Sequence, residues 1–313
     1  MMRMKSHFKR MGSKSILVVA ILLLTTASVF AQTTGSIVAW GRDDHGQISN
    51  VPLGDDFISI AAGGGHDLAL KADGSLVGWG DNTYGESSVP SGNNFIDIAA
   101  GVNHSLAIKS DGTLVAWGNN PYGECDVPTG GGFIDIAATA NYSLALRSNG
   151  SLIAWGANNE NQLNVPAGTD FIAIAAAANF GIAQKSDGTL ISWGNEIGNS
   201  PAGNYDNIAT GYNHGLAIRP DGSLVGWGNM PHGVPVPTGN DFIGIDGADY
   251  HSIALKLDGS IVAWGWNDYG QTDVPLGNNF IAISAGGYHS LALTPEPTTL
   301  LLLGLGGLVL RKR

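Results

Sequence analysis

The stretch HSLAIKSDGTLVAWG, residues 104–118, decides the fold of this chain. Two short runs, HSLAIKS and TLVAWG, are rich in β-branched and aromatic residues and flank Asp111-Gly112. An Asp-Gly pair favours a two-residue turn with positive φ that joins antiparallel strands. The stretch therefore predicts a β-hairpin.

The hairpin recurs along the chain. The same kind of turn is expected at Asp73-Gly74, Asn149-Gly150, Asp187-Gly188, Asp221-Gly222 and Asp258-Gly259. Trp-Gly pairs begin at Trp40, Trp79, Trp117, Trp155, Trp193, Trp227 and Trp264, so successive pairs are 34 to 39 residues apart. A third run in each repeat, such as NFIDIAAG at residues 94–101, adds a further strand. A repeat of this length indicates a solenoid or a propeller.

The two ends of the repeat array complement each other. TTGSIVAWG, residues 33–41, has no hairpin partner before it, and HSLALTPEP, residues 289–297, has no Asp-Gly strand after it. Pairing them leaves no exposed edge strand. We therefore predict an all-β fold, a closed seven-bladed β-propeller of three-stranded antiparallel blades, whose seventh blade is closed by the N- and C-terminal strands.

The termini differ from the repeats in composition. Residues 1–31 contain five basic residues, then the apolar run ILVVAILLL, then small residues suited to cleavage after Ala31. This order is typical of a secretory signal peptide, with an uncleaved membrane anchor as the alternative. The predicted domains are thus a signal peptide at 1–31, a propeller at 35–293 and a separate tail at 294–313.

The tail combines three parts: Pro295-Glu296-Pro297, an apolar stretch at Leu300–Leu310, and the basic end Arg311–Arg313. Eleven residues are short for a membrane-spanning helix. In its order of parts the tail resembles the PEP-CTERM sorting signal of bacterial envelope proteins. That resemblance implies an exosortase-type protease as processing partner, transient membrane association through the tail, and a product that is released or attached at the bacterial cell surface.

Charge restricts the partners of the exported part. Seven of the 15 Lys and Arg residues and all 26 Asp and Glu residues lie in 32–297, which gives this part a formal charge of −19. Phosphate binding needs a basic face, so nucleic acid is not expected as a partner. The single Cys125 cannot form an internal disulfide and is expected as a free thiol or, alternatively, in an intermolecular bridge.

The repeats carry a resemblance to a known family. HDLALKADGSLVGWGDNTYGESSVP, residues 66–90, is similar to the regulator of chromosome condensation repeat in its short bacterial form, which includes the second type of β-lactamase inhibitory protein. The resemblance spans residues 35–293 and implies a seven-bladed propeller. It does not imply one function, because the family's members have different activities.

Two loop positions vary between repeats and carry aromatic residues. One follows each Trp-Gly pair and the other precedes the histidine position, so both are expected on one face of the disc. In the inhibitory protein that the chain resembles, the corresponding loops contact the partner. We expect the partner-binding residues to be His45, Tyr84, Tyr122, His232, Tyr250, Tyr269 and Tyr288. The alternative is that Tyr-Gly is a turn element packed against its own loop.

The histidines favour a structural interpretation. One position of the repeat contains His66, His104, His214, His251 and His289, and converging imidazoles could bind zinc. Tyr142 and Phe180 occupy the same position in two repeats, which indicates a need for a planar ring instead of a metal ligand. We therefore predict no metal site. The Trp-Gly pairs are likewise interpreted as packing elements between blades.

No catalytic constellation is recognisable, and neither a catalytic residue nor a cofactor is predicted. The sequence favours an exported, monomeric scaffold that binds another protein or a surface polymer through its loop face. Two alternatives stay open. One is an extracellular enzyme acting on polysaccharide or peptide through acidic residues such as Glu160 or Asp268, and the other is a structural envelope component without a specific ligand.

Overall fold

The computed structural model describes residues 33–195, 200–230 and 233–296. The predicted signal peptide at 1–31, most of the predicted tail including Pro297, and His232 lie outside these residues. The described residues form β-strands and no α-helix. This agrees with the predicted all-β class.

Five sheets have three antiparallel strands each. They are β5 (Phe95–Ala100), β6 (His104–Lys109) and β7 (Leu114–Gly118); β8 (Phe133–Ala138), β9 (Tyr142–Arg147) and β10 (Leu152–Gly156); β11 (Phe171–Ala176), β12 (Phe180–Lys185) and β13 (Leu190–Gly194); β14 (Asn207–Thr210), β15 (His214–Ile218) and β16 (Leu224–Gly228); and β17 (Phe242–Gly247), β18 (His251–Lys256) and β19 (Ile261–Gly265).

The sixth sheet contains both ends of the described chain. Its order is β20-β21-β1-β2-β3-β4, from β20 (Ala282–Ala285), β21 (His289–Pro295), β1 (Gly35–Gly41), β2 (Phe57–Ala62), β3 (His66–Lys71) and β4 (Leu76–Gly80). β1 and β21 pair along their whole length, from Gly35↔Pro295 to Gly41↔His289. A single residue pair, Gly35↔Phe57, connects β1 to β2. The sheet therefore consists of two three-stranded groups joined at one point.

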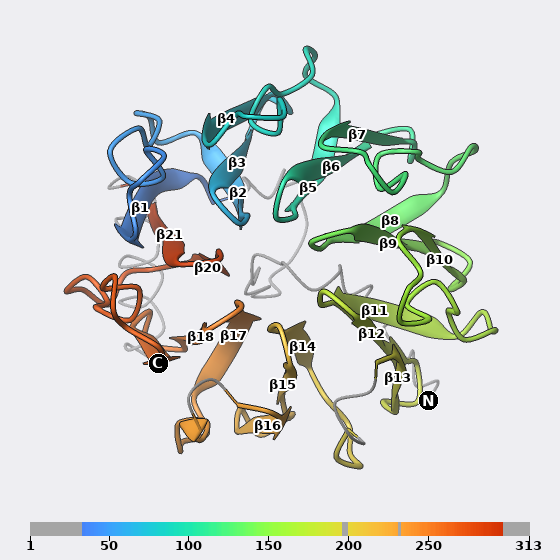
Figure 1. Cartoon of the computed structure of the whole chain (residues 1–313). Coiled ribbons are helices and arrows are strands. Elements are labelled where there is room, and N and C mark those ends of the chain that lie inside the picture. Colours follow the sequence, from blue (N-terminus) through green and yellow to red (C-terminus); the bar gives the residue numbers. More distant parts are fainter. Residues whose placement is uncertain (1–32, 196–199, 231–232, 297–313) are drawn as a thin grey trace, which may run out of the picture.

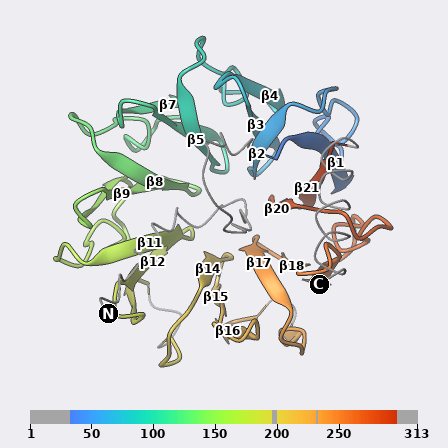
Figure 2. The same ribbon diagram turned by 180° about the vertical axis from the view of Figure 1, so that it is seen from behind.

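The sheets are arranged around a common centre, with β2, β5, β8, β11, β14, β17 and β20 innermost (Figure 1). The view from behind shows the same arrangement (Figure 2). Strands β1 and β21 lie side by side in both views and in the strand pairing.

The hydrophobic core lies between the sheets. In one cluster Leu68 and Leu70 of β3 pack with Phe95 and Ile98 of β5. The other clusters join further neighbouring sheets in the same way. The two three-stranded groups of the sixth sheet also pack together, because Leu293 of β21 contacts Phe57 of β2 and Trp79 of β4. Each sheet thus buries apolar side chains against its neighbours, which aligns the strand ends and the loops between them.

The Asp-Gly turns form as expected. In the hairpin β6–β7, Asp111 Oδ1 accepts hydrogen bonds from the Thr113 backbone N–H at 2.9 Å and from Thr113 Oγ1 at 2.7 Å. Gly112 has φ +78°, which favours glycine. In β9–β10 the turn uses Asn149, whose Oδ1 accepts the equivalent bonds from Ser151 at 3.0 and 2.7 Å.

Candidate functional site

Two sets of loops lie together on one face of the molecule. The residue after each Trp-Gly pair donates its backbone N–H to the carbonyl of the residue that precedes the central strand, as in Asp81→Gly65 at 2.8 Å and Asn119→Asn103 at 2.8 Å. The same bond is found at Arg42→Tyr288, Ala157→Asn141, Asn195→Asn179, Asn229→Asn213 and Trp266→Tyr250. Both variable loop positions therefore belong to one face, called here the loop face.

The Tyr-Gly element combines a buried anchor with an exposed ring. The Tyr84 N–H donates to Glu86 Oε2 at 2.7 Å, and the Tyr122 N–H donates to Glu124 Oε2 at 2.8 Å. Both glutamates are buried, whereas Tyr84 and Tyr122 are 53% and 54% exposed. The glutamate therefore holds the turn, and the tyrosine rings extend toward solvent. His45 occupies the same position in the first loop, with its Nδ1 3.6 Å from Asp81 Oδ2.

Five of the seven tryptophans of the Trp-Gly pairs connect neighbouring sheets through a hydrogen bond from the indole N–H. Trp117 Nε1 donates to the Glu86 carbonyl at 2.8 Å, and Trp155 Nε1 donates to the Glu124 carbonyl at 2.8 Å. Trp40, Trp79 and Trp193 make the equivalent bond to Gln271, Gln47 and Gln162. Because the indole joins one sheet to the loop of the preceding sheet, its repetition has a structural cause.

Four aromatic side chains converge on one sector of the loop face. Tyr250, Trp266, Tyr269 and Tyr288 are defined here as the aromatic cluster. The Tyr250 and Tyr288 rings are stacked, with centroids 5.3 Å apart and planes 19° apart. Trp266 meets Tyr250, Tyr288 and Tyr269 edge-on, at 5.2, 5.4 and 5.6 Å. Tyr250 and Tyr269 are 39% and 42% exposed, so the cluster presents ring surface to solvent.

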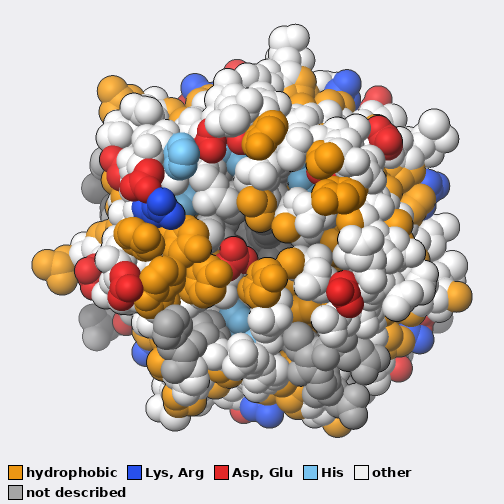
Figure 3. Space-filling model, viewed as in Figure 1, with side chains coloured by type: hydrophobic (Ala, Val, Ile, Leu, Met, Phe, Trp, Pro, Cys, Tyr) orange, Lys and Arg blue, Asp and Glu red, His pale blue; other side chains and the backbone are white. Residues whose placement is uncertain are grey.

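A guanidinium group completes this cluster. Arg42 lies over the rings of Tyr269 and Tyr288, with its Cζ 4.9 and 5.3 Å from their centroids. Its Nε donates to Asp44 Oδ2 at 2.6 Å, and this bond raises the pKa of Arg42. On the space-filling surface, a broad hydrophobic area lies beside a basic side chain in the sector of β18, β20 and β21 (Figure 3).

Sequence reasoning identified part of this cluster. It singled out Tyr250, Tyr269 and Tyr288, which the structure brings together. It missed Trp266 and Arg42, although each is an exception to a pattern. Trp266 is the one tryptophan that no glycine follows, and Arg42 is the one basic residue of 32–297 that is not beside a hairpin turn.

The remaining predicted contacts do not belong to the aromatic cluster. Tyr84 and Tyr122 lie in the loops after β4 and β7, which belong to other sheets. His45 lies in the loop after β1 that also carries Arg42, and His232 is not described. Glu160 and Asp268, considered as acidic residues of an enzyme, belong to loops after β10 and β19, with two further sheets between them.

The histidines of the repeat are buried between sheets. His66 Nε2 lies 2.8 Å from Ser105 Oγ, and His104 Nε2 lies 2.9 Å from Ser143 Oγ. His214 and His251 pair in the same way with Ser252 and Ser290. Burial lowers the pKa of His66 and His251 to about 3 and that of His104 and His214 to about 4, so these rings are neutral at pH 7.

His289, the fifth histidine at this position of the repeat, pairs with an aspartate instead of a serine. His289 Nε2 lies 2.6 Å from Asp67 Oδ1, and both side chains are fully buried. Asp67 occupies the position that serine occupies in the other bonds, and burial raises its pKa. Among the residues that the structure describes, no group of three His, Cys, Asp or Glu side chains is arranged to hold a metal ion.

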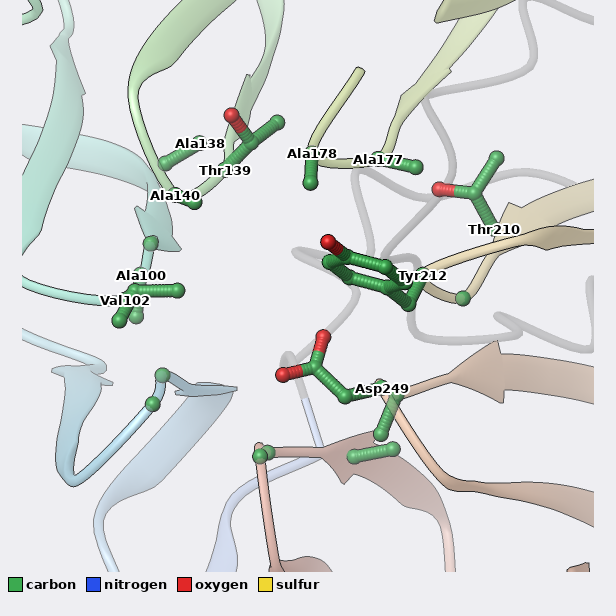
Figure 4. Close-up of a pocket in the computed structure, with 18 of the residues that line it drawn as sticks. Ala100, Val102, Ala138, Thr139, Ala140, Ala177, Ala178, Thr210, Tyr212 and Asp249 are labelled. Atoms are coloured by element: carbon green, nitrogen blue, oxygen red, sulfur yellow. The ribbon is translucent and has the colours of Figure 1, made fainter. Parts of the chain in front are cut away.

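A cavity of about 120 Å³ opens on the axis, where the loops before the central strands meet. Most of its lining residues are Gly and Ala, with Val102, Thr139 and Thr210 among them. Tyr212 and Asp249 interrupt this lining, and both side chains point into the open space (Figure 4). Sequence reasoning missed both residues because it did not compare this position between repeats.

Cys125 is a free, half-buried thiol. Its Sγ lies 3.3 Å from the Asn119 carbonyl oxygen, and burial raises its pKa to about 12. The thiol is therefore protonated and weakly nucleophilic at pH 7.

Comparison with known families accounts for the repeats. The family described as "Regulator of chromosome condensation (RCC1) repeat" matches residues 57–86, 95–124, 133–162, 206–234 and 247–271. This chain contains RCC1 repeats. The resemblance predicted from residues 66–90 is thus confirmed. No curated protein matches the chain at a significant level.

Solved structures of RCC1 propellers have the same fold. Prp20p from Saccharomyces cerevisiae is 20% identical, with a TM-score of 0.69, and the match covers 85% of this chain and 92% of Prp20p. Human WBSCR16 is 16% identical, with a TM-score of 0.71 and coverage of 84% and 99%. The CRINKLY ectodomain of the Arabidopsis thaliana receptor kinase ACR4 is 21% identical, with a TM-score of 0.64 and coverage of 75% and 90%. At these identities the likeness concerns the fold alone.

The end of the RCC1-repeat chain matches the PEP-CTERM protein-sorting motif over residues 293–313. This motif confirms the predicted sorting tail and indicates an exported, surface-associated bacterial protein that an exosortase processes. In the described part of the chain, no helix has the length and apolar character needed to cross a membrane.

Proposed function

We propose that this protein is an exported binding scaffold that recognises another protein through the aromatic cluster on its loop face. In this proposal residues 1–31 form a signal peptide, residues 35–293 form a monomeric, closed seven-bladed propeller, and residues 294–313 form a tail for sorting or anchoring. The finished protein is released or attached at the cell surface.

Closure of the propeller is supported by the pairing of the chain ends. Seven residue pairs connect β1 with β21, and the single pair Gly35↔Phe57 is all that connects β1 with β2. The sheet β20-β21-β1 then corresponds in strand number and direction to the other sheets. A closed ring gives the loop face a rigid base, which lowers the entropy lost on binding.

The observation that carries the proposal is the convergence of Tyr250, Trp266, Tyr269 and Tyr288 around Arg42. Tyr, Trp and Arg are the residue types that most often dominate the binding energy of protein interfaces. The rings hold one another in fixed orientations, so a partner that covers them loses little of their conformational freedom. Prp20p, which has this fold, binds Gsp1p and histones, and this is a precedent for protein binding by such a propeller.

Affinity capture with the purified protein tests this function. Cell-surface and medium proteins are passed over the protein, over Trp266→Ala/Tyr269→Ala, and over Leu276→Ala, a control at a fully exposed leucine. We expect a defined partner to bind the native protein and the control, and to bind the cluster variant at least about tenfold more weakly, which corresponds to 1.4 kcal/mol.

Thermal unfolding of the three proteins accompanies the capture. The cluster variant should unfold within a few degrees of the native protein, because its two side chains lie in surface loops. A partner that the cluster variant retains at full affinity would contradict the proposed binding surface. A large loss of stability would instead assign the cluster a packing role.

A further inference from the structure

The axial cavity on the loop face is asymmetric. The residue two positions before each ring residue of the central strand lines it: Gly64, Val102, Ala140, Ala178, Tyr212, Asp249 and Gly287. Five of these seven residues are Gly, Ala or Val. The two exceptions, Tyr212 and Asp249, come from neighbouring sheets, so the polar side of the cavity is confined to one sector.

The two exceptional side chains face the same space. The Asp249 carboxylate points into the cavity, and the Tyr212 ring lies beside it, with methyl groups of other sheets across the opening (Figure 4). Tyr212 is 42% exposed, so one face of its ring is free for contact. Of the described residues that line the cavity, Asp249 alone carries a charge.

The carboxylate is held in an apolar setting. Burial raises the pKa of Asp249, and no described cation or hydrogen-bond donor offsets that effect. The lining supplies mainly methyl groups and glycine backbone. A bound cation would offset the loss of hydration that raises this pKa, so a cationic group is the complementary ligand for this site.

We propose that this axial cavity is a binding site for a primary alkylammonium group, with Asp249 as its counter-ion and Tyr212 as a ring face for the cation. The alkyl chain contacts Val102 and Ala140 across the opening and Ala178 on the side next to Tyr212. The ammonium group comes from a lysine side chain of a protein or from a free polyamine, which present the same chemistry. The site lies next to the aromatic cluster and does not depend on the function proposed for it.

The residues present favour this ligand over other cations. A calcium ion takes six to eight oxygen ligands, and the cavity offers one carboxylate and one phenol among its side chains. An ammonium group with an apolar stem matches a carboxylate, an aromatic face and methyl groups. The formal charge of −19 over 32–297 also attracts cations to the protein.

Binding of a ligand in the cavity can be detected through alanine methyl groups, because Ala140 and Ala178 line it. The purified protein, labelled at alanine methyls, is titrated with n-butylammonium and monitored by NMR. We expect saturable shifts of these axial methyls. n-Butanol should cause none, and butylguanidinium and calcium chloride should bind more weakly. A lysine tripeptide and spermidine, titrated in parallel, distinguish the protein source from the polyamine source.

Three variants make the result specific. Asp249→Asn should weaken butylammonium binding at least about tenfold, and Tyr212→Ala should weaken it several-fold. Asp268→Asn, a change in an exposed loop, should leave it unchanged. Asp249→Asn should also unfold at the same or a higher temperature at pH 7.5, because it removes a desolvated charge.

Three results would overturn the proposal. The first is unchanged affinity in Asp249→Asn, and the second is no saturable shift at about 50 mM butylammonium, far above a 1 mM dissociation constant. The third is tighter binding of calcium than of butylammonium. None of these results bears on the capture experiment, because that experiment tests Trp266 and Tyr269.

Discussion

At the scale of single residues, the recurring histidine both fills space and links sheets. His104 is fully buried in β6, and its Nε2 lies 2.9 Å from Ser143 Oγ in β9. Tyr142 and Phe180 occupy the same position in other sheets, where Tyr142 Oη donates to the Phe180 carbonyl at 2.6 Å. Packing of a planar ring is thus the common requirement, and the hydrogen bond is an addition to it.

The contributions of the ring and of its hydrogen bond can be measured separately at His104. His104→Ala leaves a cavity, and we expect it to lower the free energy of unfolding by about 3–4 kcal/mol. His104→Phe keeps the ring and loses one hydrogen bond, and we expect a loss of about 1 kcal/mol. Urea unfolding compares the two variants. Equal losses would show that the hydrogen bond, and not the ring, is the main contribution.

The buried histidines also predict how stability depends on pH. Their folded pKa values are about 3 to 4, below the unfolded value of about 6.5, so the unfolded chain binds more protons between these limits. Stability is therefore fully present above pH 6.5 and is lost as the pH falls toward 4, by roughly 2 kcal/mol per histidine at pH 5. The raised pKa of Asp67 has the opposite effect on stability, because a carboxyl group that binds its proton more tightly in the folded state stabilises the fold as the pH falls.

Urea midpoints at pH 7.5, 6 and 5 test this dependence. The native protein should lose stability across the series, and His104→Phe should lose less because it has one such histidine fewer. A midpoint that does not change between pH 7.5 and 5 would contradict the assignment of neutral, buried rings.

At the scale of elements, the hairpin turn decides whether two strands can pair in the observed register. Gly112 has φ +78°, and a Cβ built on it would lie 2.8 Å from the Gly132 backbone nitrogen. The side chain before it bonds to Thr113, and Asn149 makes the same bonds to Ser151 in another hairpin. The glycine is thus required by conformation and space, whereas Asp and Asn are interchangeable.

Two neighbouring substitutions test this distinction. Gly112→Ala should lower the free energy of unfolding by more than about 1 kcal/mol, because it adds backbone strain and a close contact. Asp111→Asn should change it by less than about 0.5 kcal/mol. Thermal unfolding at pH 7.5 is a sufficient measurement. A tolerated Gly112→Ala would mean that the turn differs from the one described.

At the scale of the whole molecule, the contacts between chain ends determine closure. β1 and β21 pair over seven residues, Leu293 packs with Phe57, and His289 is bonded to the buried Asp67. These contacts join segments more than 220 residues apart in the sequence. The pairing of β1 with β21 brings the loop that carries Arg42 beside Tyr288 and Tyr269, so the position of Arg42 over the aromatic cluster depends on it.

An engineered disulfide tests the closure that we propose. Ser36 and Thr294 face each other across β1 and β21, and Thr294 Oγ1 lies 3.3 Å from the Ser36 carbonyl oxygen. Ser36→Cys/Thr294→Cys, made in a Cys125→Ser background, should form an intramolecular bond that stabilises the fold by about 2–5 kcal/mol. Melting with and without reductant and a non-reducing gel measure this. Disulfide-linked dimers instead of monomers would contradict closure within one chain.

Local sequence patterns were sufficient to predict the repeat, its hairpins, the pairing of the end strands and the sorting tail. Asp111-Gly112 and its counterparts specify turns through contacts within a few residues, and such contacts are visible in the sequence. The position of Tyr250, Tyr269 and Tyr288 on one face followed from the same repeat. The repeat did not predict that these three rings form one cluster, because it places each of them in a different loop.

What the sequence determined by itself is therefore the unit: three short strands, a turn that requires glycine, and a ring at the start of the central strand. What only the tertiary structure decided is which exceptions to the repeat become neighbours. Arg42 meets Tyr269 and Tyr288 because β1 pairs with β21, and Tyr212 meets Asp249 because two adjacent sheets converge on the axis. Such contacts join residues far apart in the chain, and their geometry is set by the packing between sheets, which no local pattern encodes.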